Sequence, residues 1–141
     1  MAQRVSLWFI GARALSGALI ATLSILLLAG AVLDIPPEFL PLAGPGPTIF
    51  FTSMGTLAAV GVFGLVRRLA SRPARAFRMI AGVVLVLSFV PDLWLLSDTG
   101  REVFPGATPA GVAVLMLMHV AAAAMIVWAL TAGADPQEEG R

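Results

Sequence analysis

The chain has no cysteine and no lysine, and few of its residues carry charge. Without cysteine, disulfides, thiolate metal sites and cysteine nucleophiles are excluded. Only 12% of the 141 residues are charged and 59% are hydrophobic, which gives a mean hydropathy of +0.95. A soluble domain of this size could not bury so much apolar surface. The composition therefore predicts one domain over residues 1–141 whose surroundings are lipid.

Several enzyme motifs are also missing. The sequence contains no glycine-rich phosphate loop, no HExxH and no serine nucleophile elbow. Its single histidine, His119, cannot provide both axial ligands of a bis-histidine haem, and a net charge of +1 gives no reason to expect a nucleic-acid partner. We expect no cofactor, and a non-enzymatic role is favoured. Asp92 and His119 would be the acid and base if the protein were a lipid isomerase.

Four continuous apolar runs divide the chain. Each holds about 18–23 residues, enough for a helix to cross a hydrocarbon core of about 30 Å. The runs are continuous rather than alternating, which favours helices over a β-barrel. They are Ala14–Leu33, Ile49–Val66, Met79–Ser97 and Pro109–Thr131. The predicted fold class is all-α, an integral membrane four-helix bundle with an uncleaved first span.

The arginines predict the orientation of the bundle. The link between the second and third runs, "RRLASRPARAFR", holds Arg67, Arg68, Arg72, Arg75 and Arg78. Arg4 and Arg13 precede the first run, whereas the other two links hold only Arg101. Under the positive-inside rule, both termini, the basic link and the polar tail 133–141 are cytoplasmic. The basic link is also a candidate contact for lipid headgroups.

The residue usage indicates the kind of membrane. Arginine in place of lysine, together with abundant alanine, glycine and proline, is typical of a GC-rich bacterial genome. We therefore expect a multi-pass protein of the bacterial cytoplasmic membrane, with membrane lipids as partners. Other membrane subunits, or a second copy of the chain, are further candidate partners.

The two outer links resemble each other. "DIPPEFLPLAGP" starts at Asp34 and "DTGREVFPGATP" at Asp98, and both read Asp-x3-Glu, then two apolar residues, then proline. Two helical hairpins related by a pseudo-two-fold axis along the membrane normal would produce this match. Shared turn chemistry would produce it as well, and the sequence leaves both explanations open. Thr108 before Pro109 is typical of a helix start.

Four stretches resemble a known family. They are "IPP", "RPARAFR", "VLSFVPDL" and "LMLMHVAAA". Together they are similar to a family of small bacterial four-helix membrane proteins that is catalogued only as a domain of unknown function. The resemblance covers most of the chain after about Leu33. It implies the four-span topology and draws attention to His119, and it implies no activity.

The depths of Asp92 and His119 predict that these two residues face each other within the membrane. Asp92 lies roughly 8 Å and His119 roughly 12–15 Å below the outer ends of neighbouring antiparallel spans. An ionised carboxylate facing lipid costs about 2.5–3.5 kcal/mol, so Asp92 should face the bundle. The candidate proton or ligand site also includes Ser88, Thr52 and Thr56. Pro91 leaves the carbonyl of Leu87 without its helical donor.

Several uses of this pair remain open. The pair is either a structural contact that fixes helix packing or a site that binds a proton, an ion or a small amphiphile, unless Asp92 is simply hydrated at the outer interface. Met54, Met116 and Met118 lie at similar depth, but membrane methionines are usually filler, so we expect no metal. We favour a non-enzymatic module with an outward-facing polar pocket. The alternative is an accessory or assembly subunit of a larger membrane complex.

Overall fold

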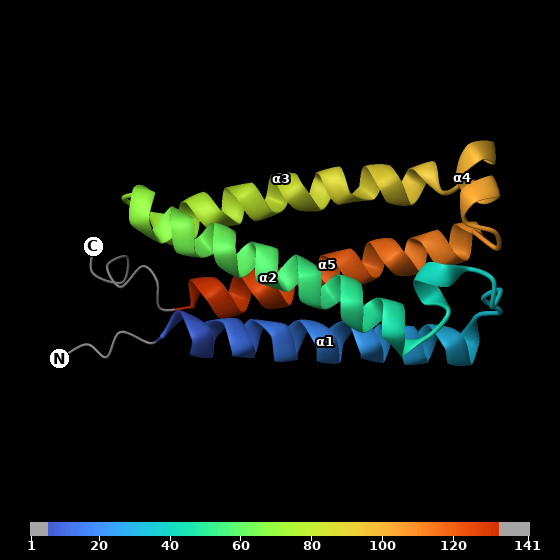
Figure 1. The fold of residues 1–141 in the computed structure, drawn as a ribbon, viewed down its shortest axis with the longest axis horizontal. Coiled ribbons are helices and arrows are strands. Elements are labelled where there is room, and N and C mark those ends of the chain that lie inside the picture. Colours follow the sequence, from blue (N-terminus) through green and yellow to red (C-terminus); the bar gives the residue numbers. More distant parts are fainter. Residues whose placement is uncertain (1–5, 133–141) are drawn as a thin grey trace.

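A computed structural model describes residues 6–132, and within this range the chain forms four long helices without any strand (Figure 1). The long helices are α1 (Leu7–Val32), α2 (Pro45–Leu69), α3 (Pro73–Trp94) and α5 (Pro109–Thr131). Each is long and apolar enough to cross a membrane. The predicted all-α class with four apolar helices is thereby confirmed. Arg4 and the polar tail 133–141 lie outside the described residues.

The helices differ in their bounds from the apolar runs. Helix α1 begins at Leu7 rather than Ala14, and α2 continues to Leu69, past the end of its run at Val66. Helix α3 begins at Pro73 within the basic link and ends at Trp94. Hydropathy marks only the part of a helix that lipid would surround, whereas backbone hydrogen bonding continues beyond it. Proline at the first helical position also explains the early start of α3, since its missing N–H would be unpaired there anyway.

Two side-chain caps shape the end of the bundle where α3 and α5 are connected. The Thr108 hydroxyl accepts a hydrogen bond from the Gly111 N–H at 3.1 Å, so α5 begins where the sequence predicted. The Ser97 hydroxyl accepts from the Gly100 N–H at 3.0 Å and starts the short helix α4 (Asp98–Val103). These caps satisfy backbone donors that a helix start leaves free.

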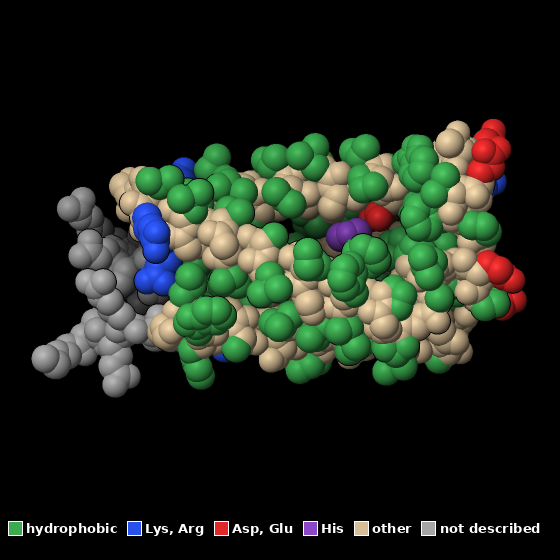
Figure 2. All heavy atoms as spheres, in the orientation of Figure 1, with side chains coloured by type: hydrophobic (Ala, Val, Ile, Leu, Met, Phe, Trp, Pro, Cys, Tyr) green, Lys and Arg blue, Asp and Glu red, His purple; other side chains and the backbone are tan. Residues whose placement is uncertain are grey.

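Most of the charged residues lie at the two ends of the bundle, with arginine prevailing at one end and acidic side chains at the other (Figure 2). We call the end that carries the α2–α3 link the basic end, and the other the acidic end. The basic end holds Arg67, Arg68, Arg72, Arg75 and Arg78, and the acidic end holds Asp34, Glu38, Asp98 and Glu102. At the basic end the Arg78 guanidinium donates to the Thr131 hydroxyl at 3.3 and 3.4 Å. The Arg13 guanidinium lies 4.8 Å from the ring centre of Trp128.

The first outer link folds back over the acidic end. The Phe39 side chain is fully buried, and Leu42 in the short helix η1 (Leu40–Leu42) is buried as well. Gly106 has a φ of +80°, and a Cβ there would lie 3.1 Å from the Phe39 backbone nitrogen. The two outer links are therefore in direct contact, and glycine is needed where they meet. The prolines of this link restrict its backbone, and the sequence predicts that Phe39, Leu40 and Leu42 fold back onto the helix ends as a lid. Leu40 departs from this prediction because it is 59% exposed.

The two hairpins are alike in order but not in how tightly they close. In chain order α1 and α2 correspond to α3 and α5, so a two-fold axis would make the α1–α5 and α2–α3 interfaces equivalent. Helix α1 is closely packed against α5, with Ala14 and Ala18 fully buried. Helices α2 and α3 meet near the basic end, where Phe63 and Phe77 stack edge to face at 5.1 Å, and diverge toward the acidic end (Figure 1). The α1–α5 interface is therefore closed, whereas the equivalent α2–α3 interface, which we call the open seam, is open toward the acidic end.

Candidate functional site

A cavity of about 690 Å³ fills the space between the diverging helices α2 and α3. Residues of α5 form its floor, and the η1 link with Phe104 closes it at the acidic end. The cavity opens on the long side of the bundle, where Figure 2 shows the histidine in a hollow with an acidic side chain beside it. Its volume lies within the range of about 300–1,000 Å³ that is usual for small-molecule pockets.

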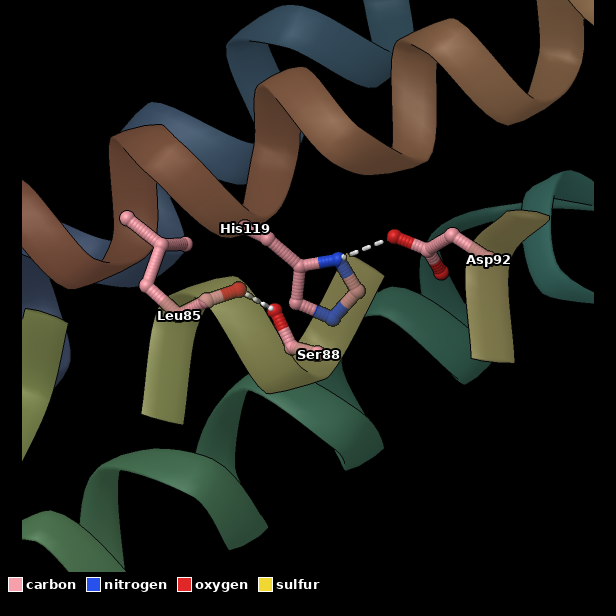
Figure 3. Close-up of polar contacts among 4 residues, drawn as sticks. All are labelled: Leu85, Ser88, Asp92 and His119. Atoms are coloured by element: carbon pink, nitrogen blue, oxygen red, sulfur yellow. Dashed lines mark hydrogen bonds and ion pairs between the residues drawn. The ribbon is translucent and has the colours of Figure 1, made fainter. Parts of the chain in front are cut away.

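Asp92 and His119 meet at the wall of this cavity (Figure 3). Nδ1 of His119 lies 2.9 Å from Oδ2 of Asp92, and the histidine side chain is 43% exposed while that of Asp92 is 7% exposed. Neither atom has a well-aligned hydrogen bond within residues 6–132. The contact is thus short but bent, because the carboxylate oxygen lies away from the direction of the ring N–H. The distance shows that the two groups face each other; a small rotation of either would align them.

Local structure explains how Asp92 reaches this position. Helix α3 continues through Pro91, and in its last turn the Leu95 N–H is shared between the carbonyls of Pro91 and Asp92, each at 3.2 Å. Ser88 lies one turn before Asp92 and donates to the Leu85 carbonyl at 2.7 Å (Figure 3). The hydroxyl of Ser88 is therefore already bonded within its own helix, although its side chain lines the cavity.

Thr52 and Thr56 of α2 line two different spaces. Thr52 lines the cavity, and its hydroxyl lies 3.3 Å from that of Thr22 on α1. Thr56 donates to the Thr52 carbonyl at 2.8 Å and lines a separate groove between α1 and α2. Of the predicted site residues, Asp92, His119, Ser88 and Thr52 share one cavity, and Thr56 stands apart. Their functional role stays a prediction.

Thr48 is a polar residue of this cavity that the sequence reasoning missed. It is 4% exposed, and its hydroxyl has no hydrogen-bond partner in the described part of the chain. It lies one turn before Thr52, so spacing along one helix face would have found it. It was overlooked because it immediately precedes the predicted start of the second span at Ile49.

The rest of the cavity wall is apolar, and it continues toward the basic end. Its deeper lining is formed by Ala58, Ala59, Val62, Phe77, Ile80, Ala81, Val84, Ala122, Ala123, Ile126 and Val127. Trp94 lines the cavity near the acidic end. The polar residues therefore gather at one end of a long apolar space.

Two of the three candidate methionines and all five arginines of the basic link lie away from the cavity. Met118 lines the cavity, Met116 packs against the core at the acidic end, and Met54 is 55% exposed. Within residues 6–132, no three His, Cys, Asp or Glu side chains are grouped so that they could hold a metal ion. The five arginines of the basic link do not line this cavity. Arg67 lies with its guanidinium 5.9 Å from the ring centre of Phe63.

Comparison with known proteins identifies a family. Residues 2–136 match the family described as "Family of unknown function (DUF6069)". The resemblance seen in the sequence, to a family catalogued as a domain of unknown function, is thereby confirmed. No curated protein and no solved structure matches the chain significantly.

Proposed function

The chain belongs to a family of unknown function, and we propose that the protein is a non-enzymatic membrane module that binds a small amphiphile. The ligand occupies the cavity between α2 and α3, with its polar head beside Asp92 and His119. The observation that carries this proposal is the cavity itself. It places one protonatable pair at the end of a long apolar space that opens sideways.

The shape of the cavity favours an amphiphile over a free ion. An ion would need several oxygen or nitrogen ligands around it, whereas most of the wall is hydrocarbon. Asp92 already has His119 as its partner at 2.9 Å. An amphiphile matches both parts of the wall, since its chain contacts the apolar residues and its head contacts the pair. Entry through the side of the bundle would let it arrive from the bilayer.

The orientation is part of the proposal. We place the protein in the bacterial cytoplasmic membrane with its basic end, and hence both termini, on the cytoplasmic side. The positive-inside rule supports this, since the five arginines of the link lie at one end and the acidic side chains at the other. The cavity then has its polar end in the outer half of the membrane.

Filling the cavity tests the proposal. A Cβ at Gly55 would meet no described atom within 4 Å, and Gly55 lines the cavity, so Gly55→Leu fills it. Gly82 is equally open but lines neither this cavity nor the α1–α2 groove, so Gly82→Leu is the matched control. Lipids that remain bound after purification in mild detergent are then identified by native mass spectrometry.

The expected result is a bound species in the native protein and in Gly82→Leu that is lost in Gly55→Leu. Equal retention by all three proteins, or no retained species in any of them, would contradict amphiphile binding in this cavity.

An accessory subunit of a larger complex is the second candidate function. The groove between α1 and α2 favours it, with a volume of about 760 Å³ and a lining that includes Gly11, Gly61 and Gly64. Such small residues let a neighbouring helix approach closely in a membrane. If this groove holds a partner, Gly61→Leu should remove the partner from the purified complex, whereas Gly55→Leu should leave it bound.

A further inference from the structure

Building on the proposed function, we infer that the ligand is an uncharged single-chain amphiphile with a hydroxyl head, of the monoacylglycerol or long-chain alcohol class. Its head lies between Thr48 and the Asp92–His119 pair, and its chain runs toward the basic end. Three observations carry this inference: the unpartnered hydroxyl of Thr48, the self-compensating charge of the pair, and the one-sided distribution of polar residues in the cavity.

Thr48 and Asp92 lie in the same layer of the bundle. Thr48 is three residues from the start of α2 and Asp92 two residues from the end of α3, which places them at about 5 and 3 Å of helix rise from the same end. Both side chains are at least nine-tenths buried and line the cavity from facing helices. A head group in this layer would therefore reach polar atoms on both walls.

The hydroxyl of Thr48 indicates what the head must supply. A buried hydroxyl without a partner loses the hydrogen bonds it would make with water, and none of the described residues replaces them. A ligand hydroxyl both donates and accepts, so a head of this kind suits the hydroxyl of Thr48 as well as the carboxylate of Asp92. Figure 3 also shows the second ring nitrogen of His119 directed away from Asp92, as a further point of contact for a head with more than one hydroxyl.

The pair itself argues against a charged head. Asp92 and His119 are 2.9 Å apart, so their charges compensate whether the proton is shared as an ion pair or both are neutral. An added anion or cation would be a further charge that this pair does not neutralise. In surroundings of low dielectric an uncompensated charge is disfavoured. An uncharged head adds hydrogen bonds without adding charge.

The apolar part of the cavity sets the direction of the chain. From Thr52 to Val62 the α2 wall extends for about 15 Å, and from Ser88 back to Phe77 the α3 wall for about 17 Å. Apart from Thr52 and Ser88 themselves, the lining residues of these two stretches are apolar. One extended hydrocarbon chain fits along this length and ends near the Phe63–Phe77 contact that closes the seam.

Trp94 provides the measurement, because it lines the cavity near the head position. In a Trp8→Phe, Trp128→Phe background Trp94 is the only tryptophan left, so all tryptophan fluorescence comes from it. The probes have equal chain length and are a monoacylglycerol, a quaternary alkylammonium, an alkyl sulfonate and an n-alkane, each brominated. Bromine quenches nearby tryptophan, and Gly55→Leu in the same background gives the quenching that arises outside the cavity.

We expect saturable quenching by the monoacylglycerol that Gly55→Leu removes, and stronger quenching when bromine lies near the head than near the chain end. The charged probes should bind at least about tenfold more weakly. Thr48→Val should weaken monoacylglycerol binding about tenfold, as one lost hydrogen bond predicts. Thr48→Ser should retain it, and Thr56→Val, in the α1–α2 groove rather than in the cavity, should have no effect.

The alternative outcomes separate this inference from the proposed function. Equal or tighter binding of the sulfonate or the alkylammonium would overturn the uncharged head, and stronger quenching from the chain end would overturn the orientation. Unchanged binding in Thr48→Val would overturn the role of Thr48. In these cases an amphiphile still binds and the proposed function stands. If no probe gives quenching that depends on Gly55, both fail.

Discussion

Asp92 and His119 face each other from different helices, with Oδ2 and Nδ1 2.9 Å apart, and the two partners differ in their access to solvent or lipid. The carboxylate is almost completely enclosed, whereas the imidazole is 43% exposed at the cavity. Loss of the contact should therefore cost more free energy at Asp92 than at His119. A buried carboxylate without its partner is costly to keep, while a partly exposed imidazole can stay neutral.

This inequality predicts the result of a double-mutant cycle. His119→Leu should lower the stability more than Asp92→Leu, because it leaves the buried carboxylate alone. The double change should cost less than the sum of the two, with a coupling of about 1–3 kcal/mol, as for residues in direct contact. Detergent melting curves of the four proteins provide the measurement. Additive effects would show that the contact contributes nothing to stability.

Phe39 should be the most important side chain of the first outer link. Its ring is fully buried, and a Cβ at Gly111 would lie only 3.2 Å from it. Phe39→Ala should cost about 3–5 kcal/mol, since it removes a large side chain and leaves a cavity. Leu40→Ala, in the same link but 59% exposed, should cost much less. Melting temperatures of the two variants test the difference, and equal losses would argue against a packed link.

Gly100 should tolerate no side chain. A Cβ there would collide with the Trp94 carbonyl oxygen and would lie 2.8 Å from the Leu95 Cα. These are backbone atoms, so the turn between α3 and α4 would have to move. Gly100→Ala should lower the melting temperature, although alanine normally favours a helix over glycine. Gly82→Ala, where no described atom lies within 4 Å of the Cβ, should be neutral or slightly stabilising. The reverse order would refute the close approach at Gly100.

The orientation can be tested by labelling. The chain contains no cysteine, so Ser71→Cys and Thr99→Cys each introduce a single thiol at an exposed position, at the basic and acidic ends respectively. A membrane-impermeant thiol reagent applied to intact spheroplasts should label the second variant and not the first, because arginine-rich links stay in the cytoplasm. Labelling of Ser71→Cys alone would invert the proposed topology.

The sequence predicted the four apolar helices and the facing of Asp92 and His119, because both follow from length and depth. Continuous apolar runs determine which segments suit a hydrocarbon core, and helix rise places two polar residues at comparable depth. The closing link was predicted in part, since Phe39 is buried and Leu40 is not. Prolines restrict such a link without determining which of its side chains turns inward.

The cavity could not be predicted in this way. Helix α5 is apolar on all sides, so periodicity does not indicate which face meets a neighbour. The match between the outer links left two related hairpins as one of two explanations, and such a relation does not reveal that one interface is closed and the other open. Thr56 was assigned to the site by its depth, but it lines the α1–α2 groove instead of the cavity. Depth along a helix was known, whereas rotation about its axis was not.

The short α2–α3 link gives the open seam a mechanical consequence. Only Ala70, Ser71 and Arg72 join the two helices at the basic end, while Asp92 lies near the opposite end of α3, about 29 Å from Pro73. A tilt of α3 about this short link therefore displaces the residues near its other end the most. A tilt of about 5° would move Asp92 by about 2.5 Å over that length, nearly the 2.9 Å that separates its carboxylate from His119. A small tilt of α3 relative to α5 would therefore be enough to change the distance between Asp92 and His119.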